Sequence, residues 1–411
     1  MNPSPASPSQ ALRQPLRVLL LSREYPPGTG GGGIGSYAQT IAHALARDGH
    51  EVHVLSCSEG QATDDSADGA VHLHRRGIPR LLPKVRRRFP ATARRLEGAG
   101  ARYREYRRLG LDFDVVEAPD WLAEGLVFAL LRARPLVAHL HTPLAFVERH
   151  NPTSFRWTHD ATLADRLERL AVRRADVVTS PSRLLADDLA RERWLVDRET
   201  RIIRYPIDVA PWADVAPADH SPPRVLVVGR LEGRKAPEVL VQAAALLRGE
   251  LPDLDVVFIG LSSLHDGRSY RDWLVELAER RNAPCRFVDS VDRTELPAWY
   301  GSARVVALPS RYDNFPYAGL EAMAAGRPLV CTERTGAAEL VAGTDAGGVV
   351  AVDDPAGLAE ALRRFLLDPR LAGRAGAEAR AVVERECSSE RVVEQRVACY
   401  REAIERWSAS R

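Results

Sequence analysis

The same succession of strand, loop, helix and strand occurs twice along this chain, once in each half. Residues 17–56 contain the apolar run RVLLLS, a loop rich in Pro and Gly, a stretch of helical spacing and the apolar run EVHVLS. Residues 224–260 repeat this order with RVLVVG, the loop RLEGRKAP, a helical stretch and DVVFIG. Short apolar runs on either side of a helix are typical of buried parallel strands. The sequence therefore predicts two Rossmann-like units in an α/β protein.

Further strand and helix pairs extend each unit into a doubly wound domain. Their apolar runs are DVVEAP, PLVAHLHTP and ADVVTSPS in the first half, and CRFVDSV, ARVVALPS and RPLVCTE in the second. Residues 209–223, VAPWADVAPADHSPP, are rich in Pro, Ala and Asp without periodicity, which is the composition of an interdomain linker. The active site is expected in the cleft between the two domains. The expected boundaries are a disordered tail at 1–15, a first domain at 16–208, the linker at 209–223, a second domain at 224–385 and a C-terminal segment at 386–411.

Composition limits the classes of protein to consider. A length of 411 residues with 45% hydrophobic residues is sufficient for two cores, and a net charge of +2 gives no overall attraction to nucleic acid. Five widely spaced cysteines without a C-x-x-C pair favour a reducing, cytoplasmic location. The beginning of the chain shows no apolar signal segment, and no apolar run reaches membrane-spanning length. Only Lys84 and Lys235 among the 57 Lys and Arg residues are lysines, so a specific use of the ammonium group is expected.

Two carboxylates lie close together in the stretch RYDNFPYAGLEAMAAGRP, at Asp313 and Glu321. An apolar run ends at Ser310 and a helix is expected from Gly319, so the loop between them lies at the carboxyl end of a strand, where open α/β sheets bind ligands. Pro316 suits a first helical turn, and the free N–H groups that follow would face an anion. Glu321 could accept hydrogen bonds from a vicinal diol such as ribose, and Asp313 could reach a second polyol. Taken singly, each acid is more often a solvated helix residue or a loop cap.

Two cations follow the first strand of the second half in the stretch GRLEGRK. Arg230 directly follows the apolar run, and Lys235 stands near the start of the next helix. Both would reach the same sheet edge, where a guanidinium and an ammonium could hold a diphosphate. Surface charge is the simpler interpretation of either residue alone. The order of two cations and two acids along one sheet edge favours a binding site.

The combination of these motifs resembles glycosyltransferase family 4, a family of retaining enzymes that use sugar nucleotides. The resemblance covers essentially the whole chain. It implies the GT-B fold, in which two Rossmann-like domains face a cleft and a C-terminal helix crosses back to the N-terminal domain. Arg230 and Lys235 match the family's basic pair, and Asp313 with Glu321 matches the spacing of its two-glutamate motif. Asp313 stands where glutamate is usual and Pro316 where glycine is usual, and these departures concern the contacts to the donor sugar more than those to the nucleotide.

The resemblance also implies roles for residues along the chain. The expected catalytic residues are Arg230, Lys235, Asp313 and His141. The expected donor-binding residues are Gly32, Gly33, Val288, Phe315, Tyr317, Ala318, Gly319, Leu320, Glu321 and Gly336. Gly336 stands in TGAAELV, which resembles a family segment beside the donor and also contains Glu339. Residues 287–291, FVDSV, are expected to hold the nucleotide base through the backbone.

The stretch REYPPGTGGGGIGSY contains a G-x-G-x-x-G pattern at Gly28, Gly30 and Gly33. A dinucleotide-binding loop would begin directly after the strand and would be followed by an acid at the end of the second strand. Here the glycines begin later and Glu59 lies beyond that strand, so the dinucleotide interpretation is weak. In the family, Gly32 and Gly33 would let the backbone approach the donor phosphate or the acceptor. A flexible surface loop is the alternative.

His141 ends the apolar run PLVAHLH and resembles the family's cleft histidine beside the donor sugar. A core or strand-end histidine is the alternative, and His139 points the same way but deeper. Asp120 in EAPDW and Gly35 are weaker candidates for acceptor contacts. A turn cap is the simpler role for Asp120.

Two D-x-D strings, DFD at 112–114 and DLD at 253–255, could hold a metal ion. Both precede strands at the amino-terminal edge of the predicted sheets. Strand entry is therefore the better interpretation, and the resemblance implies no essential metal; no cofactor beyond the sugar-nucleotide substrate is expected.

Residues 75–108 contain thirteen basic and two acidic residues. A solvated helical face is the simplest interpretation, and the functional alternatives are anionic lipid or a negatively charged acceptor. Lipid contact would place the protein peripherally on the inner face of the membrane. No recognition motif supports a nucleic-acid partner. The C-terminal segment ERVVEQRVACYREAIERW has helical spacing, and the resemblance implies a brace between the domains.

The expected function is therefore transfer of a sugar from a nucleoside-diphosphate sugar to an acceptor nucleophile, with retention and without a metal ion. The expected acceptors are a small natural-product intermediate or a lipid or polysaccharide precursor. Fixed cations would stabilise the charge that develops on the leaving phosphate, each by about 1.5 to 3 kcal/mol. Two other functions fit the pattern: a sugar-nucleotide 2-epimerase, which would need no acceptor, and a non-catalytic nucleotide-binding or membrane-adsorbed protein.

Overall fold

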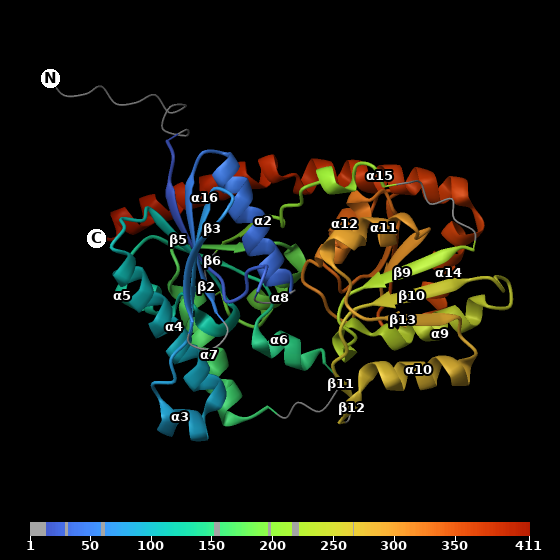
Figure 1. Cartoon of the computed structure of the whole chain (residues 1–411), viewed down its shortest axis with the longest axis horizontal. Coiled ribbons are helices and arrows are strands. Elements are labelled where there is room, and N and C mark those ends of the chain that lie inside the picture. Colours follow the sequence, from blue (N-terminus) through green and yellow to red (C-terminus); the bar gives the residue numbers. More distant parts are fainter. Residues whose placement is uncertain are drawn as a thin grey trace.

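The protein is described by a computed structural model in which two α/β lobes lie side by side and are spanned by the C-terminal helices (Figure 1). The described residues are 14–28, 32–58, 62–151, 157–195, 199–215, 222–265 and 267–411. The expected tail at 1–15 falls outside this set apart from Gln14 and Pro15, as do Gly30 and Glu59.

The first lobe is built on an eight-stranded sheet with the order β3-β4-β2-β1-β5-β6-β7-β8. The strands are β1 (Arg17–Leu21), β2 (Glu51–Cys57), β3 (Thr63–Asp68), β4 (Val71–Arg76), β5 (Val115–Pro119), β6 (Leu136–His139), β7 (Val177–Ser180) and β8 (Thr200–Ile202). Neighbouring strands are parallel except for β3 and β4. The predicted apolar runs form β1, β2, β5, β6 and β7, which are almost entirely buried, because helices cover both faces of a parallel sheet.

Seven helices of the described chain belong to this lobe. They are α2 (Gly33–Arg47), α3 (Pro83–Arg88), α4 (Pro90–Leu109), α5 (Leu126–Leu131), α6 (Leu144–Arg149), α7 (His159–Arg174) and α8 (Arg183–Arg191). Ser182 caps α8 through its side chain, which accepts the N–H of Leu185. In contrast, α2 begins directly after Gly32, which offers no side chain to cap the first N–H groups of the helix.

The second lobe contains a six-stranded, fully parallel sheet with the order β13-β10-β9-β14-β15-β16. Its strands are β9 (Arg224–Val228), β10 (Asp255–Ile259), β13 (Cys285–Val288), β14 (Val305–Leu308), β15 (Leu329–Thr332) and β16 (Gly347–Val350), with a small hairpin of β11 (Leu264–His265) and β12 (Arg268–Ser269) outside it. Its helices are α9 (Pro237–Leu247), α10 (Tyr270–Arg281), α11 (Leu296–Gly301), α12 (Tyr317–Ala324), α13 (Ala338–Val341) and α14 (Pro355–Leu367). Strands β1 and β9 have equivalent places in the sequence repeat, and both occupy inner positions of their sheets. The two-unit α/β prediction is confirmed.

Two long helices connect the lobes along one side of the molecule. Helix α15 (Pro369–Cys387) packs against α12 and α14 of the second lobe, and α16 (Ser389–Ala409) packs against α2 and β5 to β7 of the first lobe. Figure 1 shows these helices in red, running from the second lobe back to the first. The predicted crossing helix is therefore confirmed. Within the described ranges, no helix combines the length and the apolar character that a membrane span requires.

The predicted linker is partly packed rather than free. Residues Ala210–Trp212 form a 3-10 turn, and Trp212 is only 5% exposed. Its ring lies edge-on to Tyr300 of the second lobe, with centroids 5.4 Å apart. A tryptophan buries a large apolar area when it packs, which the Pro and Ala content of the segment concealed. Residues 216–221 of the linker lie outside the described set.

The solvated helical face expected over residues 75–108 is confirmed only in part, because several of its arginines are buried. Arg95 donates to Glu168 at 2.6 Å, and Arg102 donates to Glu124 at 2.8 Å, and both arginines are buried. Arg76 pairs with Glu105 at 2.6 Å. Because α4 packs into the lobe, its inward charges are neutralised by carboxylates from other elements. The exposed cations are divided between α3 with its flank (Arg80, Lys84, Arg87 and Arg88) and the outer face of α4 (Arg94, Arg104, Arg107 and Arg108).

Both D-x-D strings mark strand entries, as predicted. Asp114 directly precedes β5 and accepts the N–H of Arg17 at 2.7 Å. Asp255 opens β10 and accepts from Arg224 at 2.8 Å and from Arg286 at 2.9 Å. Their side chains are occupied in tying neighbouring strands together.

Candidate functional site

The loop that carries Asp313 leaves the carboxyl end of β14 and leads into α12. The carboxylate of Asp313 is 8% exposed and accepts a hydrogen bond from the ammonium of Lys235, while Arg234 lies 3.5 Å from its other oxygen. Burial alone raises the pKa of Asp313, but the charges of Lys235 and Arg234 outweigh it and hold the pKa below the usual value. Asp313 is therefore an ionised carboxylate fixed between two cations.

Lys235 and Arg234 stand side by side in the loop after β9 but have different contacts. Burial lowers the pKa of Lys235, and Asp313 opposes this shift. Arg234 is buried and donates to the carbonyl of Tyr312 at 2.8 Å and to Glu232 at 2.6 Å. The loop that carries the acid is thus held to the loop that carries the cations. The sequence analysis missed Arg234, because one more arginine in an arginine-rich chain gives no signal.

Arg230 does not converge on Lys235 in the way the sequence predicted. Its side chain is 65% exposed, and its guanidinium lies 3.6 Å from Glu232. Its charge nevertheless influences the pKa of a carboxylate in each lobe. It opposes the rise that burial causes in the pKa of Glu24 in the first lobe, and it contributes to lowering the pKa of Asp313. Arg230 is an exposed cation beside the place where the two lobes meet.

Glu321 lies in the second turn of α12 rather than in the opening turn. One carboxylate oxygen accepts the hydroxyl of Tyr300 at 3.0 Å, and the other is 3.9 Å from Arg293. Burial raises the pKa of Glu321, and the charge of Arg293 acts in the opposite direction. Arg293 also donates to Ser36 of α2 at 3.2 Å, so a single arginine contacts both lobes next to this acid.

Gly336 packs directly against the acid loop. Its N–H donates to the carbonyl of Asp313 at 2.8 Å, and a Cβ at this position would lie 1.6 Å from the carbonyl oxygen of Asn314. No side chain fits there, so glycine is required by the close approach of two backbones. Glu339, by contrast, binds the first lobe, because its carboxylate accepts the N–H of Leu184 at 2.9 Å and a donor of Arg204 at 2.8 Å. This places Glu339 in the contact between lobes.

Asn314 joins the acid loop to the first lobe. Its side-chain amide donates to the carbonyl of His141, and its side-chain oxygen accepts the hydroxyl of Ser182 at 2.7 Å. Tyr317 adds a hydrogen bond from its hydroxyl to the carbonyl of Pro206 at 3.2 Å. The second lobe therefore touches the ends of β6 and β7 through buried polar contacts. Sequence reasoning missed Asn314 because loop asparagines usually serve their own turn.

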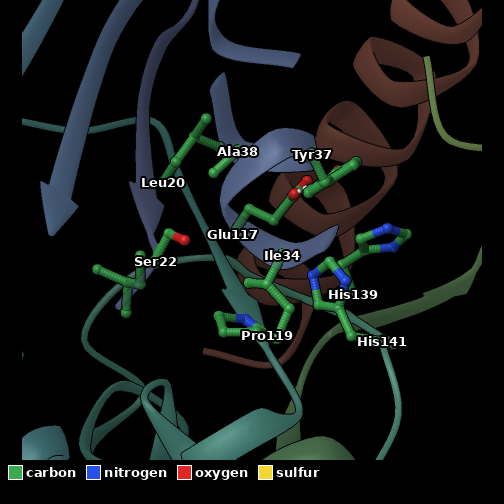
Figure 2. A pocket seen from close by; sticks show the side chains of 10 residues that line it. Leu20, Ser22, Ile34, Tyr37, Ala38, Glu117, Pro119, His139 and His141 are labelled. Atoms are coloured by element: carbon green, nitrogen blue, oxygen red, sulfur yellow. Dashed lines mark hydrogen bonds between the residues drawn. The ribbon is translucent and has the colours of Figure 1, made fainter. Parts of the chain in front are cut away.

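His141 follows β6 and lines a small pocket of the first lobe, shown in Figure 2 with Tyr37, Glu117 and His139. Its Nδ1 lies 2.6 Å from the hydroxyl of Tyr205. Burial and the charge of Arg396 lower the pKa of His141 to about 3, so the ring is neutral. The structure thus places the candidate catalytic histidine in a buried, neutral state.

Asp120 and His139, which the sequence analysis considered together with His141, both make structural contacts. The N–H of His141 donates to Oδ1 of Asp120 at 2.7 Å, so Asp120 ties the end of β5 to the end of β6, and its side chain does not cap the turn that follows it. Burial raises the pKa of Asp120 to about 8, and its Oδ2 is buried without a described hydrogen bond. His139 is fully buried, and its Nδ1 lies 2.8 Å from the hydroxyl of Thr179. His139 does lie deeper than His141, as expected.

The described glycines of this loop lie before and within the first turn of α2. A Cβ on Gly32 would lie 2.6 Å from a carboxylate oxygen of Glu24, whereas Gly33 faces open space at the start of α2. Gly35 is buried within α2, so the structure does not present it for a contact with the acceptor. Gly28 has a φ of 110°, a backbone conformation that favours glycine.

The remaining predicted donor residues are mainly packing residues in this structure. Leu320 is fully buried in the core, and Gly319 is enclosed by side chains of the second lobe. Phe315 lies edge-on to Tyr205, with centroids 5.7 Å apart. Ala318 accepts the hydroxyl of Tyr300 at 3.1 Å through its carbonyl.

Val288 ends β13, where the nucleotide base was predicted to bind through the backbone. Its carbonyl accepts the N–H of Gly260 at 3.2 Å and lies 3.3 Å from the guanidinium of Arg271. That oxygen is therefore already used within the lobe. As for metal ions, the described part of the chain contains no group of three or more His, Cys, Asp or Glu side chains arranged to hold one.

Comparison with known proteins agrees with this geometry. Residues 31–211 match the model of Glycosyltransferase Family 4, and residues 210–382 match that of Glycosyl transferases group 1. A glycogen synthase of Mycobacterium tuberculosis is 32% identical over 389 residues, covering 89% of each chain. A D-inositol 3-phosphate glycosyltransferase of Arthrobacter is 29% identical over 377 residues, covering 85% of this chain and 86% of its own.

Among solved structures, a sucrose-phosphate synthase of Thermosynechococcus elongatus superposes with a TM-score of 0.76 at 24% identity, covering 95% of this chain and 99% of its own. That likeness concerns the fold. With two lobes, a crossing helix and relatives along nearly the full length, the chain belongs to glycosyltransferase family 4, and its fold is GT-B. It is a glycosyltransferase with a nucleotide-sugar donor, which sets aside the epimerase and non-catalytic alternatives.

The close approach at Gly336 gives a test of the acid loop. In Gly336→Ala the new Cβ would overlap the carbonyl of Asn314, so we expect a loss of about 1–3 kcal/mol in the free energy of unfolding. Affinity for a nucleoside diphosphate should fall with it, because the loop that holds Asp313 is displaced. Urea unfolding and titration calorimetry measure the two effects.

The matched control is Gly373→Ala in α15, where a Cβ meets nothing within 4 Å. This change should leave affinity intact and stabilise the helix by up to about 1 kcal/mol. Equal behaviour of the two variants would show that the acid loop tolerates displacement and is not held as described.

Proposed function

We propose that the protein transfers a sugar with retention of configuration from a nucleoside-diphosphate sugar to an acceptor hydroxyl, without a metal ion. The observation that supports this most strongly is the partly buried contact between Lys235 and Asp313 at the carboxyl edge of the second sheet, just before α12. A partly buried ammonium beside a helix N-terminus is suited to a diphosphate, and a fixed carboxylate beside it is suited to sugar hydroxyls.

The chemistry follows from the charges that develop during transfer. The bond from the sugar C1 to the diphosphate oxygen breaks, so negative charge grows on the diphosphate and positive charge grows on the ring. Lys235, the exposed Arg230 and the first N–H groups of α12 would stabilise the leaving diphosphate more in the transition state than in the bound donor. These groups supply the role that a divalent cation has in other sugar-nucleotide enzymes.

Retention is inferred from the state of Asp313. This carboxylate is held by Lys235 and Arg234, so it is placed to orient the sugar rather than to attack C1. We infer front-face transfer: the acceptor oxygen bonds to C1 on the side from which the diphosphate leaves, and the leaving phosphate oxygen takes the acceptor's proton. The products are the glycoside and the nucleoside diphosphate.

The acceptor is proposed as a class. A relative is named glycogen synthase, which acts on a polysaccharide, and another is named for D-inositol 3-phosphate, a small phosphorylated cyclitol. We propose that this chain uses a small natural-product intermediate or a lipid or polysaccharide precursor. The acceptor would approach from the first lobe, where the glycine loop, Asp120 and Gly35 are located.

Lys235 is the residue whose removal tests the proposal. Lys235→Ala should lower kcat/KM by about 10- to 150-fold, because it removes one charge-assisted contact worth about 1.5 to 3 kcal/mol. Folding should persist, because Arg234 still faces Asp313. Arg374→Ala, an exposed cation of α15, is the control and should retain activity. Equal activity of the Lys235 variant and the wild type would remove Lys235 from the site.

The stereochemical course can be read from the product. Proton NMR couplings at the new anomeric centre should match those of the donor, and EDTA should leave the rate unchanged. An inverted product would contradict front-face transfer, and a rate restored only by added divalent ions would contradict the metal-free mechanism. Incubation of donor without acceptor should give no epimer.

We also propose a peripheral location at the cytoplasmic face of a membrane. No residue of α3 is buried, and Arg80, Arg87 and Arg88 are exposed around it, with Leu81 62% exposed beside them. Cations next to an exposed apolar side chain are suited to anionic lipid headgroups. Figure 1 places α3 at the lower edge of the first lobe.

Vesicle sedimentation tests this location. The protein should bind vesicles that contain phosphatidylserine and not pure phosphatidylcholine, and Arg87→Glu/Arg88→Glu should abolish the binding while leaving the protein folded. Arg370→Glu/Arg374→Glu on α15 is the matched control and should bind as the wild type does. Equal binding of both double variants, or no binding to anionic vesicles, would contradict the proposal.

A further inference from the structure

Helix α16 inserts a buried arginine, Arg396, into the first lobe, where it contacts His139 of the pocket drawn in Figure 2. The side chain of Arg396 is completely buried. Its guanidinium donates to the hydroxyl of Thr179 at 2.7 Å, lies 3.4 Å from Oε2 of Glu117, and lies 3.4 Å from Nδ1 of His139. A charge so far from water is retained only where its partners compensate for the lost hydration.

Glu117 is the anion of this buried cluster. It accepts the hydroxyl of Tyr37 at 2.6 Å on one oxygen and the hydroxyl of Tyr400 at 2.8 Å on the other. Tyr400 comes from α16, as Arg396 does. Both Glu117 and Tyr37 line the same pocket as His141 (Figure 2). The crossing helix therefore supplies two of the groups that fix the polar wall of the pocket.

The donor and acceptor roles around His139 follow from Arg396. A guanidinium only donates hydrogen bonds, so the Nδ1 that faces it must carry its lone pair. Thr179 accepts from Arg396 and can donate its own hydrogen to the same Nδ1, 2.8 Å away. His139 is thus neutral, with its hydrogen on Nε2.

The same cation acts on His141. The two imidazole rings are 4.9 Å apart, and the charge of Arg396 adds to burial in lowering the pKa of His141. Tyr205, whose pKa burial raises well above its usual value, can donate its hydroxyl hydrogen to Nδ1 of His141 at 2.6 Å. Nε2–H is then left as the donor that His141 offers to a ligand.

We propose that Arg396 is a positioning residue of the first-lobe site: the C-terminal helix carries it there to hold His139 and His141 in their neutral Nε2–H forms. The role of His141 in transfer rests on the function proposed above. The protonation states do not, because they follow from the contacts of the free protein. The helix is accordingly part of the site and not only a brace between the lobes.

Several titratable or charged groups face this histidine pair, from every element packed against it. They are Tyr37 on α2, Glu117 on β5, Asp120 after β5, Tyr205 after β8, and Arg396, Cys399 and Tyr400 on α16. Arg396 is the cation of this set, and Glu117 is its closest anion. Burial is the larger cause that keeps His139 neutral, because it lowers the pKa of the ring, and the charge of Arg396 adds to it. Removal of Arg396 takes away that charge and leaves Glu117 without its cation in the same cluster, and both changes favour uptake of a proton by the ring.

The experiment is ¹⁵N NMR of the histidine side chains in the full-length protein without ligand. In the wild type, both His139 and His141 should show the neutral Nε2–H pattern between about pH 5.5 and 8. In Arg396→Met, His139 should show the imidazolium pattern in this range. Arg396→Met/Glu117→Gln removes both charges and should return His139 to the neutral form, and Arg396→Lys should keep it neutral.

Steady-state kinetics provide the second readout. Arg396→Met should lower kcat by about 10- to 100-fold while the KM for donor changes little, because the misplaced groups belong to the first lobe. Arg396→Lys should recover most of the loss. If Arg396→Met does not fold, the Lys and double variants carry the test through their histidine spectra alone: a protonated His139 in either variant would overturn the inference.

Unchanged histidine patterns and unchanged kcat in Arg396→Met, with only a lower Tm, would overturn the inference, because a brace alone predicts that result. The outcomes also separate this inference from the proposed function. Histidine patterns that change as expected in a protein without transferase activity would sustain the role of Arg396 and contradict the function.

Discussion

The burial of Lys235, Arg234 and Asp313 in one ion cluster is the constraint on which the rest of the structure depends. Two cations and one carboxylate lie largely out of water at the end of a parallel sheet, and their opposite charges compensate for much of the lost hydration. The cluster ties the loop after β9 to the loop after β14, which fixes where α12 begins. A diphosphate could replace part of the contact of Lys235 with Asp313, since it offers the same kind of negative oxygen. The resting contact therefore prepares an anion site without exposing an unpaired ammonium.

The lobes are connected by polar groups that also serve the site. Asn314 follows Asp313 directly and donates to the carbonyl of His141, so this one residue links the loop of Asp313 to the loop of His141. Arg293 contacts Ser36 of the first lobe and lies close to Glu321 of the second. On the opposite side, α16 brings Arg396 to Glu117 and His139. Movement of one lobe against the other would break these contacts first, which couples the geometry of the site to the separation of the lobes.

Much of this organisation could be predicted from the sequence, because it depends on local patterns. Apolar runs of strand length around helices specified both sheets, and the position of Asp313 and Lys235 after strands placed them at one edge. The network around Arg396 and the clamp of Arg234 could not be predicted, because these residues acquire their roles from elements far away in the chain. Trp212 was hidden in a segment of linker composition, and the pairing of residues 75–108 depended on carboxylates elsewhere. The departures from the family pattern at Asp313 and Pro316 could be read from the sequence. The contacts of Lys235 and Arg234 that hold Asp313 could be seen only in the structure.

The most direct test of this account is a crystal structure of the protein with a nucleoside diphosphate or an intact sugar donor. The account predicts the diphosphate at the carboxyl edge of the second sheet, with the ammonium of Lys235 and the N–H groups at the start of α12 on its oxygens and Asp313 facing the sugar. A nucleotide bound elsewhere, with Lys235 still engaged only by Asp313, would contradict it.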